Sequence, residues 1–266
     1  MAQKCGTIAL LGLPNAGKSS LLNRLIGQKI APVTYKPNTT RRVVNGILTR
    51  HQVQFIFVDT PGMIARGHIP DADLIAWVVD AKKPVQNLPV QLPANRVLIL
   101  NQIDRFANKR EILPVISEWQ TALQPREIYP VSAKTGDGLE SMLDSLGLML
   151  PERSFLFDSE LMTDASEKEL VAELIREKAL FALQQEIPHA MEVVIDAFDE
   201  TRRENSKKCL VDISASLIVA RESHKSIAIG RGGSKLKEIG EKARRDLEYL
   251  LGCQVMLRLF VKAKKH

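Results

Sequence analysis

Near its start the chain reads Gly12-Leu13-Pro14-Asn15-Ala16-Gly17-Lys18-Ser19, which matches the pattern GxxxxGK[ST]. An apolar run at residues 7–11 predicts a buried strand before it, and residues 19–26 predict a helix after it, which is the context that this pattern requires. Glycines let backbone N–H groups converge on phosphate oxygens at a helix N-terminus. The alternative is an accidental glycine-rich turn, but strand, helix, lysine and serine are all in register. We therefore expect nucleotide phosphates to contact Gly12, Asn15, Ala16, Gly17, Lys18, Ser19 and Ser20.

Two later segments indicate which base the nucleotide carries. Asn101-Gln102-Ile103-Asp104 follows a strand-like run, so it lies at a strand's carboxyl end, where α/β folds bind ligands. A carboxylate at Asp104 can accept two hydrogen bonds from guanine, whereas adenine has no such donor pair. Ser132-Ala133-Lys134 follows the next strand, where a backbone N–H can meet the guanine carbonyl. Alternatively, Asp104 is a helix N-cap and Ser132 an ordinary turn residue.

Two further segments suit a γ-phosphate and its metal ion. Asp59-Thr60-Pro61-Gly62 ends a predicted strand, so Asp59 can hold Mg²⁺ through water and the Gly62 N–H can sense the γ-phosphate. A polar loop contains Thr39, Thr40 and Arg41, and a threonine there can close onto Mg²⁺ when the γ-phosphate is present. We favour Thr40, which directly precedes Arg41. The expected metal-binding residues are Ser19, Thr40 and Asp59.

The first 150 residues alternate buried strands with helices, which predicts a mostly parallel sheet of the α/β type. A short Arg50-His51-Gln52 connection predicts one antiparallel hairpin within it. We expect strands at 7–11, 43–50, 53–58, 74–79, 97–100 and 128–131, and helices at 19–26 and 139–150.

The remaining residues predict a second, smaller α+β domain. Residues 151–165 are expected to be a linker. Ser166 stands three residues before Glu169, a capping-box spacing that opens a helix, and Pro188 is expected to end it. Strands at 192–198, 209–219 and 254–261 and a helix at 235–251 follow. The predicted domains are therefore 1–150 and 166–266.

Charge changes sign sharply within this second region. Residues 151–201 hold 4 Lys and Arg against 13 Asp and Glu, whereas residues 202–266 hold 16 against 7. The basic part suits a polyanionic partner, although it can also simply face water.

The cysteines argue for a reducing compartment. Cys5, Cys209 and Cys253 are odd in number, far apart and without CxxC spacing, which argues against disulfides and against a zinc site. No apolar run reaches the ~18 residues of a membrane span. We expect a cytoplasmic protein.

A GxxG turn, Gly230-Arg231-Gly232-Gly233, lies between two helical stretches in the basic region. This turn brings backbone close to about four nucleotides in KH-type RNA-binding domains. A glycine at a helix C-cap is the alternative interpretation. The flanking cations favour RNA, and the expected RNA-binding residues are Arg221, Lys225, Ile229, Gly230, Arg231, Gly232, Gly233, Lys235, Lys237, Arg244 and Arg245.

The ordered segments GLPNAGKS, NTTR, DTPG, NQID and SAK resemble translation-factor-related GTPases. With the segment from Leu217 to Gly240, nearly the whole chain is similar to Era-type ribosome-assembly GTPases, which combine a P-loop GTPase domain with a C-terminal type II KH domain. The resemblance implies GTP hydrolysis with Mg²⁺, with Lys18, Thr40 and Gly62 in the catalytic machinery. It also implies binding to 16S rRNA near its 3′ end, action on the small (30S) ribosomal subunit, a monomer, and a peripheral association with the inner membrane. A weakly hydrolysing RNA-binding module and a general P-loop ATPase are the rival interpretations.

The chain departs from the family pattern in two places, the first of which is Gln102, which replaces the usual lysine and argues for weaker nucleotide binding. Met63 stands where Ras-like enzymes carry a water-orienting glutamine, but an apolar residue is usual there in this class, so hydrolysis must position its water otherwise. Only residues 63–72 separate Gly62 from the next strand, and the following connection carries Pro84, Pro89 and Pro93. We expect extended loops in place of two helices on one sheet face, partly exposed apolar strand residues there, and slow intrinsic hydrolysis.

Overall fold

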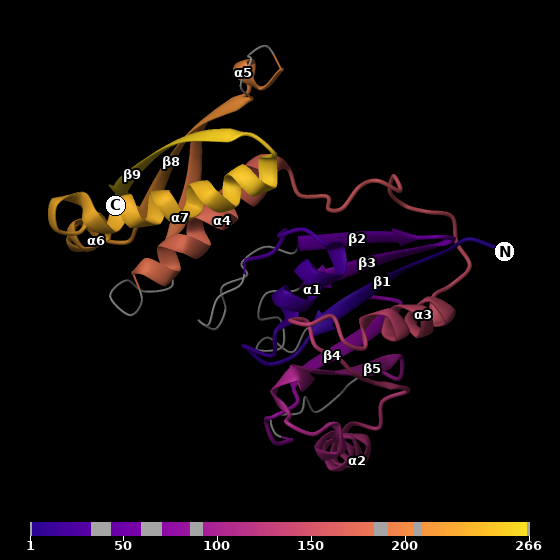
Figure 1. Cartoon of the computed structure of the whole chain (residues 1–266). Helices are drawn as coiled ribbons and strands as arrows, with labels where there is room; N and C mark the ends of the chain where they lie inside the picture. Colours follow the sequence, from indigo (N-terminus) through magenta and orange to yellow (C-terminus); the bar gives the residue numbers. More distant parts are fainter. Residues whose placement is uncertain are drawn as a thin grey trace. The chain divides into compact units, whose positions relative to one another are not determined.

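The computed structural model describes residues 2–32, 44–59, 71–85, 93–183, 191–204 and 209–264 (Figure 1). The chain falls into two compact units, Met1–Asp164 and Ala165–His266.

The first unit is built on a six-stranded sheet in the order β2-β3-β1-β4-β5-β6. All neighbours are parallel except β2 and β3, which form the predicted antiparallel hairpin. The predicted α/β fold with a mostly parallel sheet is therefore confirmed. The strands are β1 (Lys4–Leu11), β2 (Val44–Arg50), β3 (Val53–Asp59), β4 (Leu74–Asp80), β5 (Arg96–Asn101) and β6 (Ile128–Pro130).

Helices pack on both faces of this sheet. On one face lie α1 (Lys18–Ile26) and α3 (Leu139–Met149): Gly46 of β2 packs so closely on α1 that a Cβ there would lie 2.5 Å from Leu22. On the other face, Trp119 of α2 (Ile112–Leu123) packs with Ile75 and Trp77 of β4. Two 3₁₀ turns, η2 (Ile103–Arg105) and η3 (Lys109–Glu111), precede α2.

The face that carries α2 was expected to lose helices and to expose apolar residues. The described residues of the two short connections, 71–73, 81–85 and 93–95, contain no helix, and the rest of both connections lies outside the described residues. The expected exposure is wrong for the strands themselves: Ala9, Ile56, Ile75 and Trp77 are all buried. Part of the cover is α2, whose side chains share a core cluster with β4 and β5.

Residues 151–165, expected to be a linker, bond to the first unit over much of their length. The buried Gln54 side chain of β3 accepts backbone hydrogen bonds from Leu156 and Phe157, at 2.9 and 3.1 Å. Thr163 then forms an antiparallel bridge with Gly46. This stretch therefore covers part of the sheet instead of spanning solvent.

The second unit has the order α-β-β-α-α-β of a type II KH domain when the four-residue helix α5 is set aside. Its sheet has the order β7-β8-β9, with β7 antiparallel and β9 parallel to β8. Ser166 and Glu169 form the predicted capping box, and α4 ends at Ala182, before Pro188, which lies outside the described residues. The elements are α4 (Glu167–Ala182), β7 (Glu192–Asp199), α5 (Thr201–Glu204), β8 (Leu210–Val219), α6 (Glu222–Ile229), η4 (Arg231–Gly233), α7 (Ser234–Leu251) and β9 (Gln254–Ala263).

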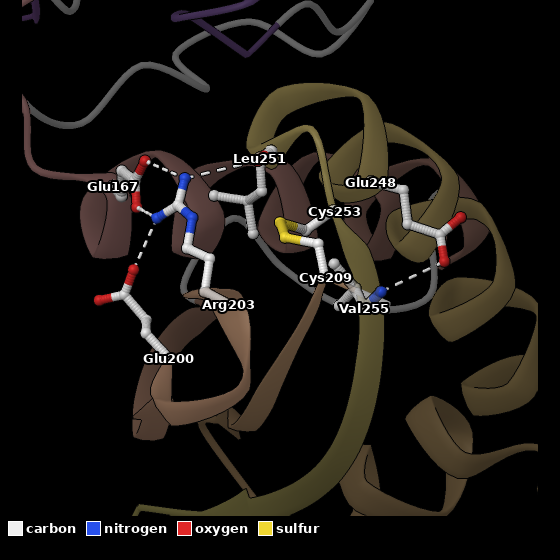
Figure 2. The surroundings of a disulfide bond; sticks show 8 residues. All are labelled: Glu167, Glu200, Arg203, Cys209, Glu248, Leu251, Cys253 and Val255. Atoms are coloured by element: carbon white, nitrogen blue, oxygen red, sulfur yellow. Dashed lines mark hydrogen bonds and ion pairs between the residues drawn. A yellow bond between two sulfur atoms is a disulfide. The ribbon is translucent and has the colours of Figure 1, made fainter. Parts of the chain in front are cut away.

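The prediction that the cysteines form no disulfide is wrong for one pair. Cys209 and Cys253 form a disulfide, with Cα atoms 5.1 Å apart (Figure 2). They stand immediately before β8 and β9, whose parallel register pairs Leu210 with Gln254, so the fold brings them together across 44 residues of chain. Cys5 is a buried free thiol.

Candidate functional site

The glycine-rich loop after β1 adopts a shape that its glycines make possible. Gly12 has φ of 145°, and a Cβ there would lie 2.1 Å from the carbonyl oxygen of Val78. Gly17 has φ of 88°, and a Cβ there would lie 2.4 Å from Asn101 Nδ2. Gly17 is also the N-cap of α1, with no side-chain cap on the first turn. The first turn of α1 therefore takes no side-chain cap from Gly17, and backbone N–H groups at a helix N-terminus are the donors that an anion can use.

Lys18 and Ser19 of α1 meet Asp59 at the end of β3. The Lys18 ammonium donates to the carbonyls of Gly12 and Leu13, at 2.9 and 3.0 Å, and the Ser19 hydroxyl donates to Asp59 Oδ2 at 3.0 Å. Burial lowers the pKa of Lys18, partly offset by the nearby Asp59 charge. Burial likewise raises the pKa of Asp59, partly offset by Lys18 and by the Ser19 hydrogen bond.

This arrangement suits a hydrated divalent ion bound to phosphate. A serine hydroxyl and a carboxylate that lie within hydrogen-bond reach of each other are the oxygen ligands that Mg²⁺ prefers. Burial disfavours the charged forms of Lys18 and Asp59, so a phosphate beside Lys18 and a Mg²⁺ ion beside Asp59 would supply the opposite charges that stabilise them. Ser20 follows on α1 and is half-buried.

Three loops meet on the side chain of Asn101. Its Nδ2 donates to Ala16 O at 3.1 Å and its Oδ1 accepts from the backbone N–H groups of Gln102 and Ala133, at 2.8 and 3.0 Å. Asn101 is only 1% exposed, so these contacts lie out of competition with water. The glycine-rich loop, the NQID segment and the SAK segment are thereby fixed relative to one another.

The two residues expected at the base bond to each other. Ser132 Oγ donates to Asp104 Oδ1 at 2.6 Å and also accepts from the backbone N–H of Thr135. Asp104 lies inside the 3₁₀ turn η2, whose N-cap is Gln102, so the interpretation of Asp104 as an N-cap is wrong. Ser132 does serve as a turn residue, as the alternative had it. Asp104 and Lys134 are exposed, and Ala133 is half-buried.

Gln102 contacts the glycine-rich loop in spite of its departure from the family pattern. Its Nε2 lies 3.3 Å from Asn15 O, and its Oε1 accepts from Arg105 Nη1 at 2.8 Å. The same Arg105 nitrogen donates to Asp80 Oδ2, also at 2.8 Å. Sequence reasoning missed Arg105 and Asp80, because neither belongs to a phosphate- or base-binding pattern.

Thr40 and Gly62, with the neighbouring Thr39, Arg41 and Met63, lie outside the described residues. Their predicted roles at the γ-phosphate and the metal are therefore untested by the geometry.

In the second unit, the GxxG turn joins α6 to α7. Gly230, Gly232 and Gly233 have positive φ, at 74°, 59° and 81°. A Cβ at Gly230 would lie 2.9 Å from Lys235, whereas no atom of the described residues lies within 4 Å of a Cβ at Gly232. The Gly230 N–H also closes the C-terminus of α6 by donating to Ser226 O, so the C-cap interpretation holds alongside the functional one.

The cations around this turn differ in how they are engaged. Lys225 pairs with Glu222 at 3.2 Å and Arg244 with Glu248 at 3.8 Å, while Lys235 packs its stem against Gly230. Ile229 is half-buried against the core of the unit. Four exposed cations have no ion pair with any residue that the structure describes, and these are Arg221, Arg231, Lys237 and Arg245.

Two sequence families match the chain. The family described as 50S ribosome-binding GTPase matches residues 7–117, and the KH domain family matches residues 186–266. The first match covers the glycine-rich loop and NQID segment, and the second covers the GxxG turn.

Curated relatives match almost the whole chain. GTPase Era of Trichlorobacter lovleyi is 41% identical over 280 residues, which cover 98% of this chain and 93% of the relative. GTPase Era of Coxiella burnetii is 37% identical over 286 residues, which cover 98% and 92%.

Solved structures agree with the sequence relatives. Era in complex with MgGDPNP and nucleotides 1506–1542 of 16S ribosomal RNA superposes with a TM-score of 0.86 at 33% identity, covering 98% of this chain and 94% of that one. A variant of Aquifex aeolicus Era bound to GDP and AlF₄⁻ gives a TM-score of 0.85, with the same identity and coverage.

Proposed function

Because the chain belongs to the Era family of GTPases, we propose that it binds GTP and GDP with Mg²⁺, hydrolyses GTP, and binds 16S rRNA near its 3′ end during small-subunit assembly. The observation that supports the nucleotide half is the junction at Asn101, whose side chain bonds the glycine-rich loop at Ala16 and the SAK segment at Ala133. A general P-loop ATPase needs no carboxylate at the base edge, so Asp104 disfavours it.

The proposed nucleotide site assigns one role to each loop. Bound Mg²⁺ would draw negative charge from the phosphates, and Ser19, Thr40 and Asp59 would hold it. Lys18 already lies against the loop and would turn its ammonium from the Gly12 and Leu13 carbonyls to the β- and γ-phosphates. The phosphates would contact Gly12, Asn15, Ala16, Gly17, Lys18, Ser19, Ser20 and Gly62, and the base Asn101, Gln102, Asp104, Ser132, Ala133 and Lys134.

We infer slow intrinsic GTP hydrolysis from the short connection between β3 and β4. β1 lies between β3 and β4 in the sheet, so the connection from Asp59 to Leu74 must cross it with only residues 60–73. A connection that short leaves little chain for a mobile switch helix. We therefore keep a weakly hydrolysing nucleotide-binding protein as a second candidate function.

In the second unit, we propose that single-stranded RNA lies against the GxxG turn. The open space at Gly232 would admit the sugar-phosphate backbone, and Arg231 and Lys237, which form no ion pair with any described residue, would contact phosphates. The proposed RNA-binding residues are Arg221, Lys225, Ile229, Gly230, Arg231, Gly232, Gly233, Lys235, Lys237, Arg244 and Arg245.

The proposed organisation is a GTPase domain at 1–150 and an RNA-binding domain at 166–266, in a cytoplasmic monomer. Among the helices that the structure describes, none combines the length and apolar character needed to span a bilayer. A peripheral association with the inner membrane rests on the resemblance alone and stays a prediction.

The deciding experiment measures nucleotide and RNA together. Equilibrium titrations should give much tighter binding of GDP than of ADP, and an RNA of the 16S 3′ end should bind with an affinity that falls as salt rises. Turnover of GTP with and without that RNA then separates the two candidate functions. If no hydrolysis is detected in either case, the second candidate, a weakly hydrolysing nucleotide-binding protein, is supported. Equal affinity for GDP and ADP would overturn the guanine assignment.

A further inference from the structure

A series of hydrogen bonds that begins outside the predicted motifs, at Asp80 and Arg105, connects β4 to the glycine-rich loop. Asp80 ends β4 and is 6% exposed, with Oδ1 accepting from the Lys82 N–H at 2.9 Å and Oδ2 accepting from Arg105 at 2.8 Å. Arg105 ends η2 and reaches from Asp80 to Gln102 Oε1. Gln102 in turn contacts the Asn15 carbonyl through its other amide atom.

This series of hydrogen bonds matters because the carboxamide of Gln102 ends in two unlike atoms. Its oxygen only accepts and its nitrogen only donates, so Gln102 can contact a backbone carbonyl only when the nitrogen points to the loop. Arg105 has donors and no acceptor, and it therefore fixes the oxygen on its own side. The Arg105 side chain is in turn held by Asp80, whose position is set by the pairing of β4 with β5.

The series of hydrogen bonds ends at the carbonyl oxygen of Asn15, a residue with an unusual backbone conformation. Asn15 has a φ of 64°, a left-handed conformation that is uncommon for a residue other than glycine. A donor held on its carbonyl stabilises that conformation. Asn15 also lies in the stretch that we propose to wrap the phosphates, so a change in its backbone would reach the nucleotide.

We propose that Arg105 is a positioning residue for guanine nucleotide: anchored on Asp80, it orients the Gln102 carboxamide so that this side chain braces the phosphate-binding loop at Asn15. The inference rests on the proposed function, because it concerns the affinity of the same site. It assigns to Arg105 and Asp80 a role that the nucleotide-binding motifs do not include.

The test is a double-mutant cycle on the full chain, with GDP affinity as the readout. Arg105→Ala should weaken GDP binding by about three- to tenfold, the loss of one well-placed hydrogen bond. Arg105→Lys keeps a donor without an acceptor and should restore part of that affinity. Gln102→Lys removes the acceptor that needs orienting, so Arg105→Ala in this background should change GDP affinity by less than about twofold.

If the Asp80–Arg105 ion pair only stabilises the fold, the cycle should give a different pattern. In that case Arg105→Ala would lower the melting temperature equally in both backgrounds and leave GDP affinity unchanged, which would overturn the proposal. Arg110→Ala is the matched control, since Arg110 is exposed and its side chain has no ion pair with any described residue. If the unmodified protein binds no GDP, the proposed function fails; if it binds GDP and the cycle is flat, only this inference fails.

Discussion

The two candidate binding regions are built in opposite ways. In the nucleotide site, the side chains that fix the loops are buried: Asp59, Asn101 and Ser132 are each 1% exposed or less. In the proposed RNA site, the GxxG turn is open at Gly232, and the exposed Arg221, Arg231, Lys237 and Arg245 form no ion pair with any described residue. In the first region, hydrogen bonds between protein groups fix the shape of the loops, whereas the second region presents an open glycine turn and several exposed cations. Replacing a buried anchor of the first region should therefore lower both stability and binding, whereas replacing an exposed cation of the second should lower binding alone.

The largest expected effect concerns the stability of the second unit, where we expect a disulfide to contribute what buried hydrogen bonds contribute in the first unit. Reducing the Cys209–Cys253 disulfide, or replacing Cys253 with Ser, should lower the free energy of unfolding by up to about 4 kcal/mol, because the bond closes a loop that spans 44 residues. Denaturant unfolding of the full chain with and without reductant measures this, and hydrogen exchange of β8 and β9 locates it. Cys5→Ser is the control for a thiol outside the pair. Identical unfolding of reduced and oxidised protein would show that the bond stabilises nothing.

The next effect tests the buried junction of the first unit. Asn101→Ala removes the hydrogen bonds to Ala16, Gln102 and Ala133 and leaves buried partners unsatisfied. The free energy of unfolding should therefore fall by about 3 kcal/mol. GDP affinity should fall as well, since three loops lose their common anchor. Calorimetry and GDP titration measure both. A variant with full stability and full affinity would contradict the idea that this site is held by its own hydrogen bonds.

A smaller effect separates base reading from loop packing at Asp104. Asp104→Asn replaces an acceptor with a donor at the base edge and should lower GTP affinity about 10- to 100-fold while favouring xanthine nucleotide. The bond from Ser132 can still be accepted by the amide oxygen, so stability should change little. Competition between GTP and XTP is the measurement, and an unchanged preference would remove Asp104 from base recognition.

An effect of similar size tests the open region, and the chain offers a matched control. Gly232→Asp places a side chain and a negative charge against the proposed RNA phosphates and should weaken RNA binding by about 1–3 kcal/mol without changing GDP affinity. Gly252 at the other end of α7 has a φ of 63° and equally open surroundings. Gly252→Asp therefore carries the same backbone strain without the RNA contact. Equal RNA affinities of the two variants would mean that the turn is not the RNA clamp.

Much of the fold was predictable because its signals are local. Buried strands and the capping box at Ser166 depend on neighbouring residues, and they lie where the sequence pattern put them. Helix α2 escaped prediction because Pro114 and the 65% exposed Leu113 blur its apolar pattern. Pro114 is tolerated there because it stands in the first turn, where the backbone N–H has no helical partner.

The glycine-rich loop, the order of the segments proposed to read the base, the type of each unit and the GxxG turn could all be recognised from the sequence, because each is a short pattern whose chemistry is complete within a few residues. Which distant groups meet depends on the tertiary structure. Cys209 and Cys253 became partners through the parallel register of β8 and β9. Asp80 and Arg105 came to lie beside Gln102 because β4 and β5 are neighbours in the sheet. Such pairings depend on strand order and register, which the chain settles only when its apolar faces pack together.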